Sequence, residues 1–252
     1  MAVTLHFRAI LLKVIGMYAR IGLVGDVHAE DHHLEKALDF LQQQAVDVIL
    51  CTGDVADGSG DLSRCIALLA EHQVAVVRGN HDRWLLEDKA RHIPDAHLVD
   101  QLNAEELAYL ANLPVEISID TPLGALLLCH GVRRNDLKKV WPGTDRLPVE
   151  KCQHMDALIR SREYALMVNG HMHYRTLIHF DRLTLINAGT LKGRHRPGFS
   201  LLDCHAGEIT GYEFQPDPTP VRTLPVGHTA DVEIFADTQA FTGQWQPLTL
   251  YD

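Results

Sequence analysis

Basic residues are scarce in this 252-residue sequence, which has 23 lysines and arginines against 33 aspartates and glutamates and a formal net charge of −10. Nucleic acid and anionic membranes attract proteins through a positive surface, so this balance disfavours non-specific binding to either. The sequence also lacks an apolar run of about 18 residues, the length that spans a bilayer. We therefore expect no membrane partner and find no strong nucleic-acid signal.

The cysteines are few and unpaired in pattern. There are five, an odd number, without a CxxC pair or a zinc-finger spacing, so neither a disulfide framework nor a structural zinc site is indicated. Cys51 and Cys129 lie inside apolar runs, where a free cysteine packs as a small hydrophobic residue. This cysteine content favours a reducing, cytoplasmic location.

The first sixteen residues form an apolar stretch interrupted by Arg8 and Lys13. A signal peptide has its charges before the apolar region and a small-residue cleavage site after it, and this stretch has neither. We expect residues 1–16 to be an N-terminal extension. It either forms an additional strand or helix or precedes a true start at Met17.

The first third of the chain alternates between strand and helix patterns. Three short apolar runs each end in a polar turn: Ile21–Val24, Val46–Cys51 and Val74–Val77. Between them, residues 33–43 and 62–69 have apolar side chains at helical spacing, and Asp61 can cap the second helix. This β-α-β-α-β order predicts parallel strands covered by helices.

The remainder of the chain is mostly strand-like. A capping-box pattern at Asn103 and Glu106 predicts another helix, and two apolar runs around a Pro-Leu-Gly turn predict a hairpin. A helix, a strand and a run of antiparallel strands follow, over 149–160, 165–168, 178–180, 183–186, 199–202 and 209–214. After Gln215 the sequence is proline-rich and weakly patterned. We expect one domain over 17–214 and a tail over 215–252 that packs on it.

Side chains of metal-binding type follow the predicted strands at the points where they end. The turns are Asp26-x-His28, Gly53-Asp54, Gly79-Asn80-His81-Asp82, His130-Gly131, Gly170-His171-x-His173 and Asn187-Ala188-Gly189-Thr190. In open α/β sheets, ligands bind beyond the carboxyl ends of the strands. We therefore expect these turns to meet at one rim of the sheet.

The chemistry of these side chains indicates metal ions. The candidate ligands are Asp26, His28, Asp54, Asn80, His130, His171 and His173. Imidazole, carboxylate and amide groups without thiolate favour Mn, Fe, Zn, Ni or Co over a structural zinc, and we favour Mn or Fe. Seven ligands are too many for one ion but suit two divalent or trivalent ions that share a carboxylate, an arrangement that stabilises displacement at phosphorus. One such turn alone is usually structural, so the prediction rests on their joint occurrence.

The order of these motifs resembles that of the calcineurin-like metallophosphoesterases. The motifs are Gly25-Asp26-Val27-His28, Gly53-Asp54-x-x-Asp57, Gly79-Asn80-His81-Asp82, His130-Gly131 and Gly170-His171-Met172-His173, and the resemblance covers roughly residues 18–205. It implies an α/β fold, a four-layer α/β/β/α sandwich of two mixed β-sheets flanked by helices, with a binuclear metal site. The domain over 17–214 would then be a metallophosphoesterase domain.

The resemblance also implies a role for each residue. Asp26, His28 and His173 would bind the first metal, Asn80, His130 and His171 the second, and Asp54 would bridge them. A bridging hydroxide would be the nucleophile. His81 would be the general acid that protonates the leaving oxygen, and Asp82 would orient or polarise its ring. An imidazole titrates near neutral pH, which suits proton transfer.

Arg78 is a weaker candidate, for contact with the substrate. It resembles the arginine that grips phosphate in the protein-phosphatase branch, and a guanidinium suits bidentate phosphate contact. A surface salt bridge explains it equally well. The sequence after Asp54 lacks the Tyr-Val-Asp-Arg-Gly pattern of that branch, which disfavours a phosphoprotein substrate. We expect Asp57 to support its loop, and Asn187 and Thr190 to brace the histidine loops.

These observations predict a metal-dependent hydrolase that cleaves phosphomonoesters or phosphodiesters and acts on a small phosphorylated substrate. One alternative is a catalytically silent binding or scaffold protein of the same fold, against which the complete ligand set argues. The other is a Mn-dependent nuclease. The negative net charge and the lack of a combined aromatic and basic surface argue against it. The sequence leaves the physiological substrate and the oligomeric state open.

Overall fold

The first of two β-sheets is built around the predicted β-α-β-α-β unit. The computed structural model describes residues 16–89, 95–230 and 232–251. In it, β1 (Arg20–Val24), β2 (Val48–Cys51) and β3 (Ala75–Val76) are parallel, as expected. Helices α1 (Asp31–Gln43) and α2 (Leu62–Glu71) connect them. Three antiparallel strands extend the sheet beyond β1: β9 (Gly198–Asp203), β10 (Glu208–Phe214) and β11 (Pro218–Pro225).

The second sheet has the order β12-β7-β8-β6-β5-β4, and β13 pairs with β7. Its strands are β4 (Glu116–Thr121), β5 (Gly124–Cys129), β6 (Leu166–Asn169), β7 (Arg175–Phe180), β8 (Leu183–Ala188), β12 (Ile234–Phe235) and β13 (Leu248–Thr249). The predicted hairpin is β4–β5. Strands β5, β6 and β8 run parallel to one another, and helix α5 (Gln153–Ser161) lies between β5 and β6 in the chain.

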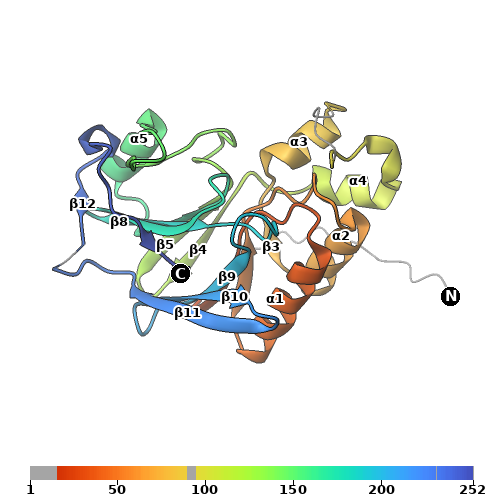
Figure 1. The fold of residues 1–252 in the computed structure, drawn as a ribbon, viewed down its shortest axis with the longest axis horizontal. Coiled ribbons are helices and arrows are strands. Elements are labelled where there is room, and N and C mark those ends of the chain that lie inside the picture. The colour runs from red at the N-terminus through yellow and green to blue at the C-terminus, as the bar shows by residue number, and fades with distance from the viewer. Residues whose placement is uncertain (1–15, 90–94, 231, 252) are drawn as a thin grey trace.

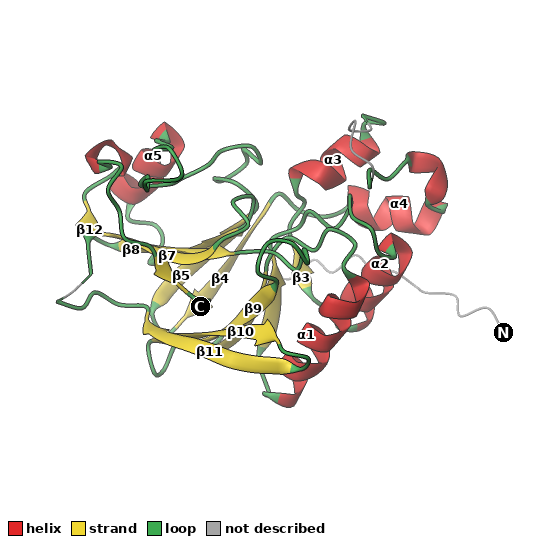
Figure 2. Cartoon of the chain, viewed as in Figure 1, coloured by secondary structure: helices red, strands yellow, loops and turns green. Residues whose placement is uncertain are grey.

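Three hydrophobic cores separate four layers, which confirms the expected sandwich (Figures 1 and 2). Ile21 and Leu23 of β1 pack against the second sheet, while Val24 joins the core under α1 and α2. Helices α3 (Asn80–Leu86) and α4 (Ala104–Ala111) join that same outer core. Helix α5 covers the other outer face through Met155 and Leu158. Because successive side chains of a strand point to opposite faces, each strand contributes residues to the cores on both sides of its sheet.

Local signals place the helix ends where the sequence predicts them. The Asp61 carboxylate accepts the Arg64 N–H at 2.9 Å, and Asn103 and Glu106 form the expected capping box. Helix α3 differs from expectation, because the sequence pattern indicates only a turn there. The helix begins directly after Gly79. The backbone N–H of Gly79 donates to the Asp82 carboxylate in the first turn at 2.9 Å.

The prediction of a single run of antiparallel strands over 178–214 is wrong between β8 and β9. Strands β7 and β8 pair in the second sheet, whereas β9 and β10 pair in the first. All six residues of β8 are buried, and so are five of the six in β9. Each strand therefore needs a partner on both edges. The second edge partner of β8 is β6 and that of β9 is β1, and these two belong to different sheets.

The segment 215–252, expected as a tail, contains three strands in its described residues. Strand β11 consists of half-buried and exposed residues and is not an apolar run. It is held by pairing with β10 at the edge of the first sheet, where prolines are tolerated. Strands β12 and β13 pair with β7 in the second sheet. Backbone pairing with distant strands leaves little signal in the local sequence.

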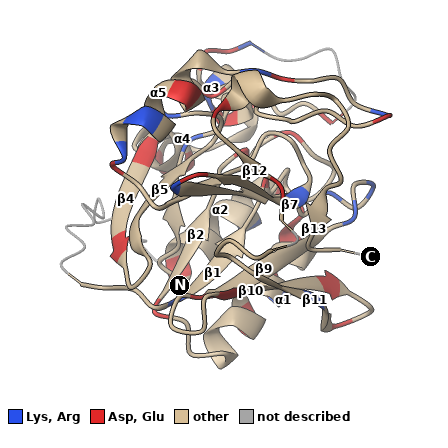
Figure 3. Ribbon diagram, turned by 90° about the vertical axis from the view of Figure 1, so that its left-hand side faces the viewer, with Lys and Arg blue, Asp and Glu red and all other residues tan. Residues whose placement is uncertain are grey.

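Charged residues lie mostly on helices, loops and edge strands, with lysines and arginines interspersed among aspartates and glutamates in the view of Figure 3. In the described part of the chain, no helix has both the length and the apolarity needed to cross a membrane. The N-terminal extension expected over 1–16 falls outside the described residues except for Gly16.

Candidate metal centre

Loops from both sheets bring all seven candidate ligands to one place. Asp26 and His28 follow β1, Asp54 follows β2, Asn80 begins α3, His130 follows β5, and His171 and His173 follow β6. Five of the seven residues are at most 1% exposed: Asp26, His28, Asp54, Asn80 and His130. The two histidines after β6 are half-buried. The expected meeting of the turns at one rim is therefore what the structure shows.

The ligand atoms fall into two groups that share a border. Asp26, His28 and His173 have ligand atoms within 4.8 Å of one another, and so do Asp54, His130 and His171. A third set of this kind joins Asp54 to His28. Asp54 therefore lies between the two groups.

The distances within each group suit a cation. In the first group, the Nε2 atoms of His28 and His173 are 3.0 Å apart, and His173 Nε2 lies 3.3 Å from Asp26 Oδ2. In the second, His130 Nε2 lies 2.9 Å from Asn80 Oδ1 and 3.2 Å from Asp54 Oδ2. Lone pairs and carboxylate oxygens gathered this closely repel one another unless a positive charge lies among them. The donors are nitrogen and oxygen, so the residues fit divalent metal ions.

Backbone carbonyls orient two of the histidines. His28 Nδ1 lies 2.9 Å from the Asp57 carbonyl oxygen, and His130 Nδ1 lies 2.8 Å from the Thr52 carbonyl oxygen. A carbonyl can only accept, so Nδ1 carries the proton and Nε2 presents a lone pair to the cluster. Hydrogen bonds also fix both Asp26 oxygens, from Thr52 Oγ1 and from the His171 N–H, each at 2.8 Å.

The loops adopt strained backbone conformations to present these side chains. Four of the seven candidate ligands have positive φ angles: His28 (49°), Asp54 (46°), His171 (64°) and His173 (60°). Such angles are uncommon for residues other than glycine and cost about 1–3 kcal/mol each. They persist where surrounding structure enforces them, which here includes the predicted brace from Thr190, whose hydroxyl donates to the Asp26 carbonyl at 2.7 Å.

Two glycines leave room for the carboxylates. A Cβ atom on Gly170 would overlap Asp26 Oδ1 and crowd Thr52 Oγ1, and a Cβ atom on Gly79 would overlap Asp54 Oδ1. The glycines of the Gly-Asn-His-Asp and Gly-His-x-His motifs are therefore required by the space that the two carboxylates occupy.

The charges of the buried groups are balanced within the cluster. Burial by itself would raise the pKa of Asp26 and Asp54, but the surrounding histidines, His130 foremost, together outweigh it, and both pKa values lie below the usual range. The two carboxylates in turn raise the pKa of His130 to about 10, against the effect of burial. Burial lowers the pKa of His28 and of His171 to about 4. The carboxylates are therefore ionised and His28 and His171 are neutral, which are the forms that bind metals, whereas His130 would have to release a ring proton when a metal binds.

The ring of His81 is held by Asp57 and not, as the sequence suggested, by Asp82. His81 Nδ1 lies 2.6 Å from Asp57 Oδ2, and its Nε2 faces the cluster, 3.9 Å from Asp54 Oδ2. Successive residues of a helix point in different directions, so adjacent side chains on α3 do not meet. Asp57 was expected only to support its loop.

Asp82 instead binds backbone. Its carboxylate accepts the N–H groups of Val55, Ala56 and Gly79 at 2.8–3.0 Å. Burial, together with the neighbouring charge of Asp54, raises the pKa of Asp82 to about 6. Asp82 thereby ties the Asp54 loop to the start of α3. Arg78 is half-buried beside Gly79, and its N–H donates to the Pro114 carbonyl at 2.8 Å. Its contact with a substrate stays a prediction.

The chain combines an α/β/β/α sandwich with a cluster of histidines and aspartates that fits divalent metal ions. The model of the calcineurin-like phosphoesterase superfamily domain matches residues 19–207. The chain therefore belongs to the calcineurin-like phosphoesterase superfamily, as its motifs predicted. The family and the clusters support hydrolysis of phosphoester bonds and divalent metal binding.

The chain is similar to a protein phosphatase in part of its sequence and to phosphoesterases of known structure in its fold. It is 36% identical over 76 residues to serine/threonine-protein phosphatase 1 of Salmonella typhimurium, a match that covers 29% of this chain and only 34% of that protein. The structure of a metallophosphoesterase from Sphaerobacter thermophilus superposes with a TM-score of 0.59 at 22% identity, over 81% of this chain and 89% of that one. A novel archaeal phosphodiesterase superposes with a TM-score of 0.50 at 16% identity, over 76% and 98%. At these identities the two structures show a shared fold.

Proposed function

We propose that the protein is a phosphoesterase whose site holds two metal ions that share Asp54. Asp26, His28 and His173 hold one ion, and Asn80, His130 and His171 hold the other. The position of Asp54 carries this proposal, since its carboxylate has both His28 and the His130–His171 pair within 4.8 Å. A site for one ion would not need ligand atoms on both sides of one carboxylate.

Two ions bound there would activate water and neutralise the charge that develops on the phosphoryl oxygens. The protein itself contributes orientation and a proton. His28 and His130 keep their Nδ1 protons on backbone carbonyls and thus keep Nε2 free to bind. His81 donates a proton from Nε2 to the leaving oxygen, because Asp57 holds Nδ1 and turns Nε2 toward the cluster.

The test combines metal content with turnover. The purified protein is loaded separately with Mn²⁺, Fe²⁺, Zn²⁺, Ni²⁺ or Co²⁺, its metal content is measured by elemental analysis, and p-nitrophenyl phosphate and its bis-ester are offered as substrates. We expect two ions per chain and turnover of at least one ester. Asp54→Asn should lower turnover more than about 100-fold and leave at most one ion.

Asp120→Asn is the matched control, because Asp120 is exposed on β4 and lies outside the cluster. This variant should bind as many metal ions as the wild type and hydrolyse the esters at the same rate. A single ion in the wild type, or two ions and full turnover in Asp54→Asn, would contradict the shared carboxylate. Two bound ions without turnover of any ester would instead support the catalytically silent alternative.

A further inference from the structure

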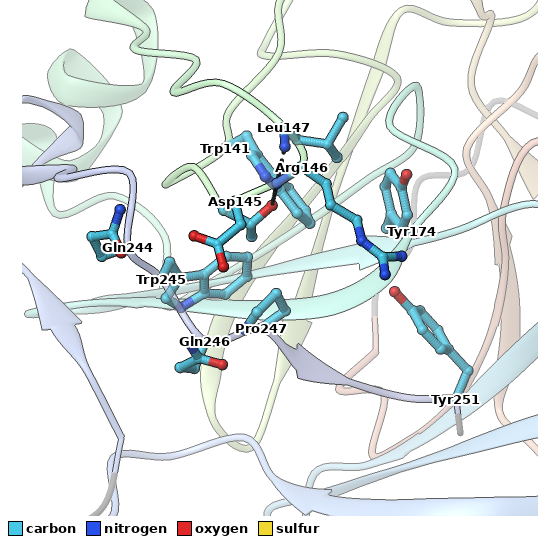
Figure 4. Close-up of a pocket in the computed structure, with 11 residues that line it drawn as sticks. Trp141, Asp145, Arg146, Leu147, Tyr174, Gln244, Trp245, Gln246, Pro247 and Tyr251 are labelled. Atoms are coloured by element: carbon cyan, nitrogen blue, oxygen red, sulfur yellow. Dashed lines mark hydrogen bonds between the residues drawn. The ribbon is translucent and has the colours of Figure 1, made fainter.

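A cavity lined by aromatic rings lies beside the candidate metal centre. Its volume is about 380 Å³, which is within the range of small-molecule pockets, about 300–1,000 Å³. Four of the residues that line it are aromatic: Trp141, Tyr174, Trp245 and Tyr251. Figure 4 shows them around the Arg146 side chain, whose guanidinium points toward the two tyrosines.

The rings are held in place by contacts with one another. Trp141 packs against Tyr174 with ring centroids 5.3 Å apart and against Trp245 edge-on at 5.1 Å. Both tryptophans are buried, with at most 4% of their surface exposed, whereas Tyr174 is 37% exposed. The backbone N–H of Trp245 also donates to the Gly143 carbonyl at 3.0 Å. The cavity therefore has a fixed floor and a more open tyrosine side.

Two links connect the cavity to the metal centre. Tyr174 directly follows the candidate ligand His173, so the cavity wall and the ligand share one stretch of backbone. The ring centroids of His195 and His173 are 5.2 Å apart. The next residue is Arg196, and its Cζ atom lies 5.0 Å from the centroid of the Tyr251 ring. These links place the wall of the cavity next to the His173 side of the candidate metal centre.

The polar groups of the cavity suit a heteroaromatic ring better than a plain hydrocarbon. Asp145, Arg146, Gln244 and Gln246 line it and can donate to or accept from the edge of a ring. The indole N–H of Trp141 is buried and has no acceptor within the described residues. Trp245 and Tyr251 lie beyond residue 207, where the match to the family model ends. This part of the wall therefore lies outside the residues that the family model matches.

We propose that the cavity binds the base of a nucleotide-type phosphate ester while the phosphate lies on the metal centre. The proposal rests on the proposed phosphoesterase function and names its substrate class. The ring of an aromatic side chain stacks face to face on a nucleobase, and this contact strengthens binding by about 10- to 100-fold per base. The base is small enough for this cavity, and the negative net charge of the chain disfavours a nucleic-acid strand.

Paired substrates test the proposal, since each pair differs only in the presence of a base. Thymidine 5′-p-nitrophenyl phosphate is compared with the 5′-p-nitrophenyl phosphate of 1,2-dideoxyribose, and adenosine 5′-monophosphate with ribose 5-phosphate. We expect kcat/KM to be about 10- to 100-fold higher for the member of the pair that carries the base. Tyr251→Leu should reduce this ratio toward one, because it should lower kcat/KM more for the member that carries the base than for the member without one.

Tyr18→Leu is the matched control, because Tyr18 precedes β1 whereas the ligands follow the other end of that strand. It should leave the ratio unchanged. A second measurement does not depend on turnover. Trp141 and Trp245 are two of the three tryptophans in the sequence, so adenosine, added without phosphate, should quench the fluorescence of the wild type, and ribose should not.

The outcomes separate the two proposals. Quenching by adenosine without turnover of any ester would overturn the phosphoesterase proposal and leave a base-binding cavity. Turnover with equal kcat/KM within each pair, and no quenching by adenosine, would overturn the cavity proposal and leave the phosphoesterase. A preference for the base that Tyr251→Leu and Tyr18→Leu leave equally intact would place the base elsewhere and also overturn it.

Discussion

Replacement of Asp57 tests how the proton donor is held. The Asp57 carboxylate and His81 Nδ1 are 2.6 Å apart, and both side chains are largely buried, with 5% and 11% of their surface exposed. A hydrogen bond that involves a charged group contributes about 1.5–3 kcal/mol, whereas one between neutral groups contributes about 0.5–1.5 kcal/mol. Asp57→Asn keeps an acceptor but loses the charge, at a cost of about 1–1.5 kcal/mol. Asp57→Ala loses the whole bond.

These energies convert directly into rates, because about 1.4 kcal/mol corresponds to a tenfold change. We expect Asp57→Asn to lower turnover about tenfold and Asp57→Ala about 10- to 100-fold. The side-chain changes leave the Asp57 backbone carbonyl in place, and this carbonyl orients His28. Metal content should therefore stay at the wild-type level in both variants, which separates loss of the proton donor from loss of metal.

The assay compares two leaving groups. p-Nitrophenolate leaves without needing a proton, whereas the alkoxide of an alkyl phosphate must be protonated as it departs. The loss in Asp57→Ala should accordingly be much larger for the alkyl ester than for the p-nitrophenyl ester, with Asp120→Asn as the control. Equal losses for both esters, or no loss for either, would refute the assignment of His81 as proton donor and of Asp57 as its positioning residue.

Two further changes probe the support of the site and of the fold. Gly170→Ala places a methyl group where Asp26 Oδ1 lies, so it should weaken metal binding about 10- to 100-fold by elemental analysis and titration; unchanged affinity would show that the loop can move aside. Asp156→Ala removes the acceptor of the Thr238 N–H (2.9 Å) and hydroxyl (2.6 Å), and should lower the free energy of unfolding by about 1–3 kcal/mol in urea at pH 7. Burial opposes ionisation of Asp156, but the hydrogen bonds from Thr238 and Gln239 prevail and hold its pKa below the usual value. Its stabilising effect is then complete above the unfolded pKa of about 3.9 and disappears as the pH falls through the folded pKa, so the difference between wild type and variant should shrink at low pH. A difference that stays constant with pH would contradict this.

Local sequence signals were sufficient for the parallel core and for the composition of the candidate metal centre. Apolar runs that end in Gly-Asp, Gly-Asn-His-Asp or Gly-His-x-His mark both a strand and the turn that follows it. Since the carboxyl ends of parallel strands face the same rim, the side chains of these turns must meet. The glycines of these motifs also have a local cause, because Gly79 and Gly170 give the carboxylates space.

Contacts between distant parts of the chain decided the rest. The antiparallel run breaks between β8 and β9 because each strand completes a different sheet, and no local pattern specifies which sheet a buried strand joins. The partner of His81 is Asp57, 24 residues earlier, because the adjacent Asp82 points elsewhere on α3. The aromatic cavity combines the loop after β5, the residue after His173 and the end of the chain. Sequence by itself thus determined the chemistry of the metal-binding turns, whereas only the tertiary structure decided which groups orient them and what lies beside them.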